Sequence, residues 1–86
     1  FGRFNGEEVA CELSVDPDKV EIITDRFGKG ATFLPFDGQQ VRARVKVCKS
    51  QQFFGWVASM GRAVSIAAPQ SLVEEYRDYL RFLLEE

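Results

Sequence analysis

Residues 41–47, VRARVKV, alternate apolar and basic side chains without a break. Because successive side chains of a strand point to opposite faces, this pattern predicts a half-buried strand that continues to residue 48. The apolar residues face a core in this prediction, and Arg42, Arg44 and Lys46 face the other side. These three cations are either a binding face or the solvated side of the strand.

Three further stretches predict strands around this one. Residues 9–15, VACELSV, alternate in the same way and predict a second half-buried strand. Residues 31–36 predict a short strand that leads into an Asp37-Gly38 hairpin turn, and residues 63–69 predict another that stops at a proline.

Two helices are predicted between the strands. Residues 16–28 begin with Asp16, a good N-cap, and end at Gly28, a natural terminator. Residues 50–61 begin with Ser50 as the cap and end at a second glycine.

A last helix is predicted over residues 71–86, which open with a Ser71–Glu74 capping box. Phe82 and Leu84 fall off its apolar stripe, so a partner or a neighbouring domain is needed to cover them. They are therefore candidates for an interface. The stripe itself comprises Leu72, Val73, Tyr76, Tyr79, Leu80 and Leu83.

The order strand, helix, strand, strand, helix, strand, helix predicts an α+β fold, a ferredoxin-like βαββαβ sandwich with an additional C-terminal helix. In this fold the strands over 9–15 and 41–48 are neighbours in the middle of the sheet. Residues 1–8 are interpreted as a linker from a preceding domain and residues 9–86 as the folded domain. We expect the chain to be a fragment, since it does not begin with Met.

Two interpretations of the basic strand follow from this arrangement. Glu12 and Ser14 share a face with the three cations, so an Arg–Glu cross-strand pair, worth roughly 0.2–1 kcal/mol, is favoured. An anion-binding face for Arg42, Arg44 and Lys46 is the alternative. It lacks the exposed aromatic rings on which RNA-binding sheets stack bases.

Composition limits the function classes. The chain has 86 residues, of which 45% are hydrophobic, so we expect one domain with a real core. Its net charge of −2 disfavours non-specific binding to duplex DNA. No run of about 18 apolar residues is present, and we expect a cytoplasmic protein without a membrane contact.

Catalytic and metal chemistry lack their usual residues. The sequence contains no His, and its two cysteines, Cys11 and Cys48, form no CxxC pair, so neither a zinc site nor another cofactor is predicted. Both cysteines are interpreted as small buried hydrophobes. No nucleophile with a base and no carboxylate pair is evident, so we expect no enzyme.

One long segment resembles a known family. Residues 53–80, FFGWVASMGRAVSIAAPQSLVEEYRDYL, place a Trp helix with a terminal glycine before a V-x-I strand, a proline and a Leu/Glu/Arg-rich helix. Together with DRFG at 25–28 and DGQQVRARVKV at 37–47, this resembles the C-terminal extension (WCX) domain of WYL-domain-containing bacterial transcriptional regulators. The resemblance covers roughly residues 9–86. Trp56, Gly61 and Pro69 carry the pattern and are interpreted as structural.

The resemblance implies a division of labour. In that family an N-terminal winged helix-turn-helix binds promoter DNA, and a WYL barrel senses an effector, with single-stranded nucleic acid among its ligands. The extension domain has a ferredoxin-like core and takes part in dimerisation and in relaying the signal. This chain has neither a helix-turn-helix nor a Trp-Tyr-Leu signature. The family supplies no catalytic residues to carry over.

Three hypotheses result. The first is a regulatory, homodimerising module beside WYL and helix-turn-helix domains, with Phe82 and Leu84 at an interface. The second is a nucleic-acid binder that uses Arg42, Arg44 and Lys46. The third is a small-ligand sensor with its ligand at a sheet-edge dimer interface. We favour the first.

Overall fold

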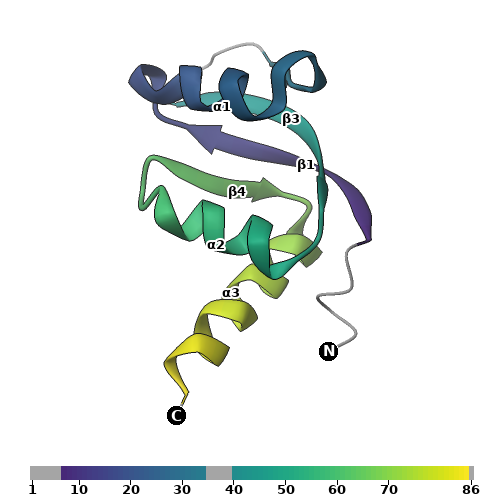
Figure 1. The fold of residues 1–86 in the computed structure, drawn as a ribbon, viewed down its shortest axis with the longest axis vertical. Coiled ribbons are helices and arrows are strands. Elements are labelled where there is room, and N and C mark those ends of the chain that lie inside the picture. Colours follow the sequence, from purple (N-terminus) through teal and green to yellow (C-terminus); the bar gives the residue numbers. More distant parts are fainter. Residues whose placement is uncertain (1–6, 35–39, 86) are drawn as a thin grey trace.

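The computed structural model describes residues 7–34 and 40–85, and these form a four-stranded antiparallel sheet with two helices on one face (Figure 1). The elements in chain order are β1 (Glu8–Val15), α1 (Val20–Phe27), β2 (Thr32–Phe33), β3 (Val41–Cys48), α2 (Gln51–Ser59), β4 (Val64–Ala68) and α3 (Gln70–Leu84). The strand order is β2-β3-β1-β4. The predicted α+β, ferredoxin-like sandwich with an additional C-terminal helix is confirmed.

The two long strands, β1 and β3, lie side by side in the middle of the sheet, as predicted. They pair in antiparallel register along their whole length, with Glu12 opposite Arg44 and Ser14 opposite Arg42. The alternation that the sequence predicts is realised, because every second side chain enters the core. The buried positions of the two strands are Cys11, Leu13, Val15, Ala43, Val45 and Val47.

The core continues from the sheet into α2 and α3. Ser50 caps α2 as predicted, since its Oγ accepts the backbone N–H of Phe53 at 3.2 Å. Phe54 is fully buried, and its ring centroid lies 5.6 Å from that of Tyr76 and 5.5 Å from that of Tyr79. These aromatic contacts hold α3 against α2.

Trp56 joins α2 to α1 on the other side. Its ring meets Phe27 edge to face with centroids 5.7 Å apart, and the Arg26 guanidinium carbon lies 4.8 Å from its centroid. Ile23 is fully buried and packs α1 against the core. Trp56 is thus packed between helices, which is the structural role expected of it.

The predicted capping role of Asp16 is wrong. Residues Pro17–Lys19 form a 3-10 turn before α1 begins, and the Asp16 side chain makes no cap hydrogen bond. Its Oδ1 accepts the Gln40 Nε2–H at 3.0 Å instead. Gly28 ends α1 as predicted, with a φ of 56° that a residue with a Cβ adopts only with strain.

The predicted capping box at Ser71 and Glu74 is also wrong. α3 begins one residue before Ser71, and the Pro69 carbonyl accepts the N–H groups of Leu72 at 3.0 Å and Val73 at 3.1 Å. Leu83, predicted to lie on the apolar stripe, is 56% exposed. The C-terminal end of α3 projects beyond α2 and β4, so this residue has no core to enter (Figure 1).

The remaining comparisons with the sequence concern β1, β2 and two predicted features that lie outside the described residues. β1 begins at Glu8, one residue earlier than predicted, and residues 1–6 of the predicted linker lie outside the described residues. β2 covers only Thr32–Phe33 of the predicted strand, and the predicted Asp37-Gly38 turn is likewise outside the described residues.

Candidate functional site

The basic side chains of β3 project from the sheet face that α1 and α2 leave uncovered, which we call the open face. Arg42, Arg44 and Lys46 are all exposed, as the alternation predicts. α3 does not cover this face, because it packs against β4 and α2. The three candidate cations therefore stand in one row along a central strand.

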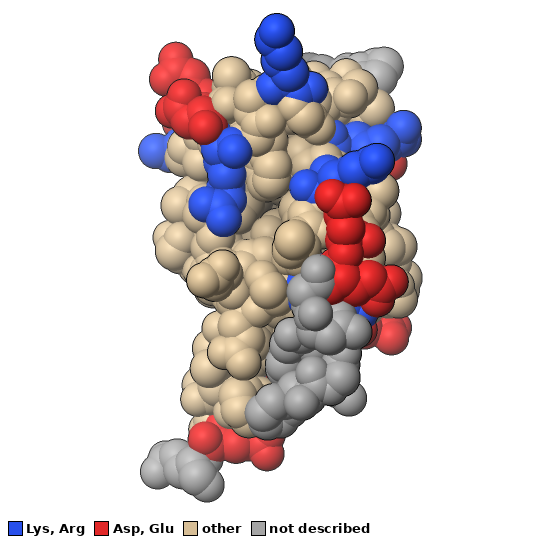
Figure 2. All heavy atoms as spheres, turned by 45° about the vertical axis from the view of Figure 1, so that its right-hand side comes forward, with Lys and Arg blue, Asp and Glu red and all other residues tan. Residues whose placement is uncertain are grey.

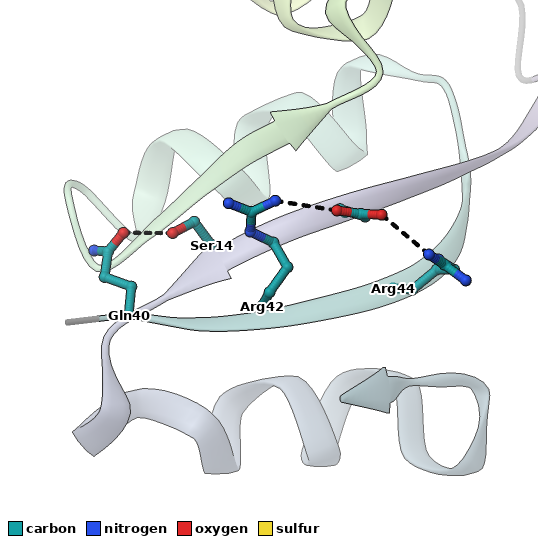
Figure 3. A network of polar contacts seen from close by, with 5 residues as sticks. Ser14, Gln40, Arg42 and Arg44 are labelled. Carbon is teal, nitrogen blue, oxygen red and sulfur yellow. Dashed lines mark hydrogen bonds and ion pairs between the residues drawn. The ribbon is translucent and has the colours of Figure 1, made fainter. Parts of the chain in front are cut away.

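Glu12 of β1 binds two of these cations at once (Figure 3). Its Oε1 lies 3.1 Å from Arg42 Nη1 and its Oε2 lies 3.2 Å from Arg44 Nη2. The hydrogen bonds from Arg44 and then from Arg42 lower the pKa of the Glu12 carboxyl. One carboxylate neutralises only one of the two guanidinium charges, so this group of three side chains keeps a net positive charge.

This cross-strand bridge is the arrangement that the sequence favoured for the strand. The two arginine side chains are 46% and 56% exposed, so water screens their attraction to Glu12. The bridge orients Arg42 and Arg44 more than it stabilises the fold. Both guanidiniums keep N–H groups directed at solvent and can still contact an anion.

Lys46 differs from the two arginines. It lies opposite Ala10 of β1 in the sheet register and is exposed. Within residues 7–34 and 40–85, no carboxylate forms an ion pair with it. Its ammonium group is therefore available to a binding partner.

A second polar network closes the other end of the open face. The Ser14 hydroxyl donates to Gln40 Oε1 (Figure 3), and the Gln40 amide donates in turn to Asp16. This network joins the end of β1 to the start of β3. Its charged member is Asp16.

The sheet also has a shallow hollow of about 220 Å³ beside a β-bulge. The register between β1 and β4 shifts at Glu12 and Leu13, so Ala67 has no opposite residue. The lining residues are Ala10, Cys11, Glu12, Arg44, Ala68 and Pro69. This volume is below the roughly 300–1,000 Å³ typical of small-molecule sites.

The last turn of α3 presents three consecutive apolar side chains. Phe82 is 42% exposed, Leu83 is 56% exposed and Leu84 is 82% exposed. Phe82 and Leu84 are the interface candidates of the sequence, and they lie far along the chain and in the fold from the basic strand. The structure thus offers two separate surfaces, the open face and the end of α3.

The cysteines occupy different environments. Cys11 is buried, and burial, with a smaller effect of the Glu12 charge, raises the pKa of its thiol to about 11. Cys48 is exposed on the open face, so its predicted burial is wrong. Cys48 lies two residues after Lys46 and therefore on the same face of β3. The alternation of the strand is the sequence signal that indicates its exposure.

Lys49 forms polar contacts that the sequence analysis does not predict. Its Nζ lies 3.2 Å from Glu75 Oε1 of α3 and 3.6 Å from Glu7 Oε1 at the start of β1. The three residues are far apart in the chain, and no short-range pattern links them. This ion-pair group ties the start of β1 to α3 and is the third polar feature of the structure.

Metal ligands do not converge in the described part of the chain, where no group of three or more His, Cys, Asp or Glu side chains is placed to hold an ion. Among the same residues, no helix has the length and apolar character needed to cross a bilayer.

One comparison with known proteins assigns this α+β sandwich to a family. The family model described as the WCX domain matches residues 7–84. The chain belongs to the WCX domain family. WCX domains are regulator-associated domains, the C-terminal extension found with WYL domains, so the family resemblance inferred from the sequence is confirmed. No curated protein matches this WCX domain.

Proposed function

We propose that this WCX domain is a non-catalytic regulatory and dimerisation module of a bacterial WYL-type transcriptional regulator. In this proposal a preceding WYL domain binds the effector and an N-terminal helix-turn-helix binds DNA. The WCX domain holds two protomers together and relays the bound state between them. Membership in a regulator-associated family supports this assignment.

The observation that carries the dimerisation role is the apolar end of α3. Phe82, Leu83 and Leu84 place apolar surface at a helix end that projects from the body. Contiguous exposed apolar surface is a feature of protein–protein interaction sites. We take the partner to be a second copy of the chain.

The area of this apolar surface indicates how tightly two copies of the chain would associate. A standard interface buries about 800 Å² on each partner, and three partly exposed side chains cover much less than this. We therefore expect weak, concentration-dependent association of the 86-residue chain, with a tighter dimer in a longer protein where neighbouring domains add contacts.

The Lys49 ion-pair group supports the relay role. It contacts Glu7, where a preceding domain would join the sheet, and Glu75 of α3. A shift of the chain at Glu7 reaches the proposed dimer helix through this one side chain. The relay therefore needs no movement of the hydrophobic core.

Light scattering over a concentration series tests the dimer. We expect the average mass of the wild-type chain to rise with concentration and that of the Phe82→Glu/Leu84→Glu variant to stay monomeric with an unchanged circular dichroism spectrum. Phe33→Glu is the matched control, since Phe33 is also 42% exposed but lies on β2. A wild-type chain that is monomeric throughout, or a dimer that survives the double substitution, contradicts the proposal.

A second candidate function is anion binding, including single-stranded nucleic acid, on the open face. The positive charge left after Glu12 pairs with two arginines, together with the ammonium of Lys46, favours it. Its test is an oligonucleotide titration at two salt concentrations. Affinity should fall with salt and in the Arg42→Ala/Arg44→Ala/Lys46→Ala variant, and should rise in Glu12→Gln, which releases both guanidiniums. If the triple-alanine variant and the Glu12→Gln variant bind the oligonucleotide with equal affinity, the open face is excluded as the site.

A further inference from the structure

The outer edge of β3 is paired with β2 along only part of its length. β2 pairs with Ala43 and Arg44, and the Leu34 N–H donates to the Arg42 carbonyl at 2.9 Å. Beyond this point, no strand in the described part of the chain lies beside the outer edge of residues 45–48. We call this stretch the free edge.

The direction of the backbone groups along the free edge follows from their neighbours. In an antiparallel ladder, the N–H and C=O of one residue point to the same side, and the side alternates along the strand. The Arg42 carbonyl points toward β2, whereas the Lys49 N–H points toward β1 and donates to Glu7 at 2.7 Å. The N–H and C=O groups of Lys46 and Cys48 therefore point outward, where an added strand can pair with them.

Two adjoining hollows, of about 330 and 500 Å³, lie along the free edge. Arg26, Arg44 and Lys46 line them, and no Asp or Glu is among their lining residues. Phe27 and Phe53 form the apolar side nearest the helices. In Figure 2, Lys and Arg side chains border an uncharged area on this side of the molecule, and Asp and Glu side chains lie beside them.

We propose that the free edge is a docking site for an extended acidic segment of another protein, which adds to the sheet as a strand beside β3. Acidic side chains at alternate positions lie next to Lys46 and Arg44 on the open face. Apolar side chains at the intervening positions lie next to Phe27 and Phe53. Charge complementarity and the outward backbone groups together select this partner.

A peptide suits the free edge better than a nucleic acid. The outward carbonyls of Lys46 and Cys48 need N–H donors at strand spacing, which a phosphate backbone does not supply. The outward positions of β1 and β3 also hold no aromatic ring for base stacking. The site lies at the opposite edge of the sheet from β4 and α3, so it does not depend on the proposed dimer.

The test is a titration of the ¹⁵N-labelled chain with the blocked peptide Ac-EVEVEVE-NH₂. We expect the amide signals of Lys46 and Cys48 to shift and their hydrogen exchange to slow. A fully N-methylated version of the peptide, with the same charge but without backbone donors, should not bind. Ac-KVKVKVK-NH₂ should not bind either.

Two substitutions test the protein side. Lys46→Glu should weaken binding about tenfold or more, while Arg62→Glu, the same charge change on an exposed turn between α2 and β4, should leave it unchanged. Cys48→Pro removes an outward N–H without changing charge and should also weaken binding, since an edge strand accepts proline.

Several outcomes overturn the proposal. Binding of the N-methylated peptide as tight as that of the parent peptide would show that charge alone is recognised. Shifts that avoid residues 45–48, or a Lys46→Glu variant with unchanged affinity, would place the site elsewhere. An oligo-dT that displaces the peptide and binds the same amides more tightly would identify a nucleic-acid site instead.

Discussion

Lys49, at the junction between β3 and α2, forms an ion pair with Glu75 of α3, with Nζ and Oε1 3.2 Å apart. The Lys49 side chain is only 13% exposed. The Glu75 hydrogen bond is the largest of the effects that raise the pKa of Lys49. This pair is the polar link between the central sheet and the helix whose end we propose as the dimer contact.

Lys49→Met should lower the melting temperature and loosen α3, because the substitution leaves the Glu75 and Glu7 carboxylates without their cation. We expect a loss of a few degrees in a thermal melt and faster amide exchange in α3. Lys19→Met, at an exposed lysine of the 3-10 turn, is the control and should change neither.

The same pair predicts how stability changes at alkaline pH. Because the folded-state pKa of Lys49 is raised, its contribution is fully present below the usual value of 10.5 and is lost as the pH rises through the folded value. The difference in melting temperature between wild type and Lys49→Met should be constant near neutrality and shrink only above pH 10.5. A difference that already shrinks at neutral pH would contradict this assignment.

Glu12→Gln should remove an acid-sensitive contribution to stability. The two arginines lower the folded-state pKa of Glu12, so its contribution is present above the usual value of 4.5 and is lost as the pH falls through the folded value. The melting temperatures of wild type and Glu12→Gln should therefore converge as the pH drops below 4.5. Melts of both proteins from neutral to acid pH measure this, and a gap that persists at the lowest pH would point to a cause other than ionisation.

Gly55→Ala should stabilise the domain. Gly55 lies inside α2, where alanine is favoured over glycine by about 0.5–1 kcal/mol. An added Cβ would lie 3.8 Å from the Tyr79 hydroxyl, which is an ordinary contact distance. Urea unfolding should show the gain.

Gly28→Ala is the matched comparison. The φ of Gly28 is +56°, so the substitution should cost about 1–3 kcal/mol although the space around it is open. Two glycine-to-alanine changes of opposite sign would separate helix propensity from backbone strain. A loss of stability in Gly55→Ala would show that the Tyr79 contact is tighter than its distance implies.

The alternation in residues 41–47 was enough to predict the open face, because a period of two leaves only one way to bury the valines. The bridge from Glu12 could be predicted as well, since the topology makes its strand the neighbour of β3. These predictions depend on local pattern and on a single topology rule.

The remaining features depend on contacts between distant segments. Asp is a residue type that favours N-caps, but Gln40, which β3 brings close to Asp16, donates a hydrogen bond to the Asp16 carboxylate. The Lys49 ion-pair group joins three distant segments. β2 covers only Thr32–Phe33 and leaves the free edge without a neighbouring strand in the described part of the chain. No periodicity in the sequence encodes these.

The two thiols should differ sharply in reactivity. At pH 8 a thiol with a pKa of about 11 is ionised to only about one part in a thousand, and Cys11 is also buried, whereas Cys48 is exposed. A thiol reagent such as DTNB should therefore modify Cys48 rapidly and Cys11 only through unfolding. In Cys48→Ser the fast phase should vanish, and in urea the wild-type chain should react at both positions. A fast phase in native Cys48→Ser would mean that β1 opens to solvent, and would contradict the tight pairing of β1 between β3 and β4.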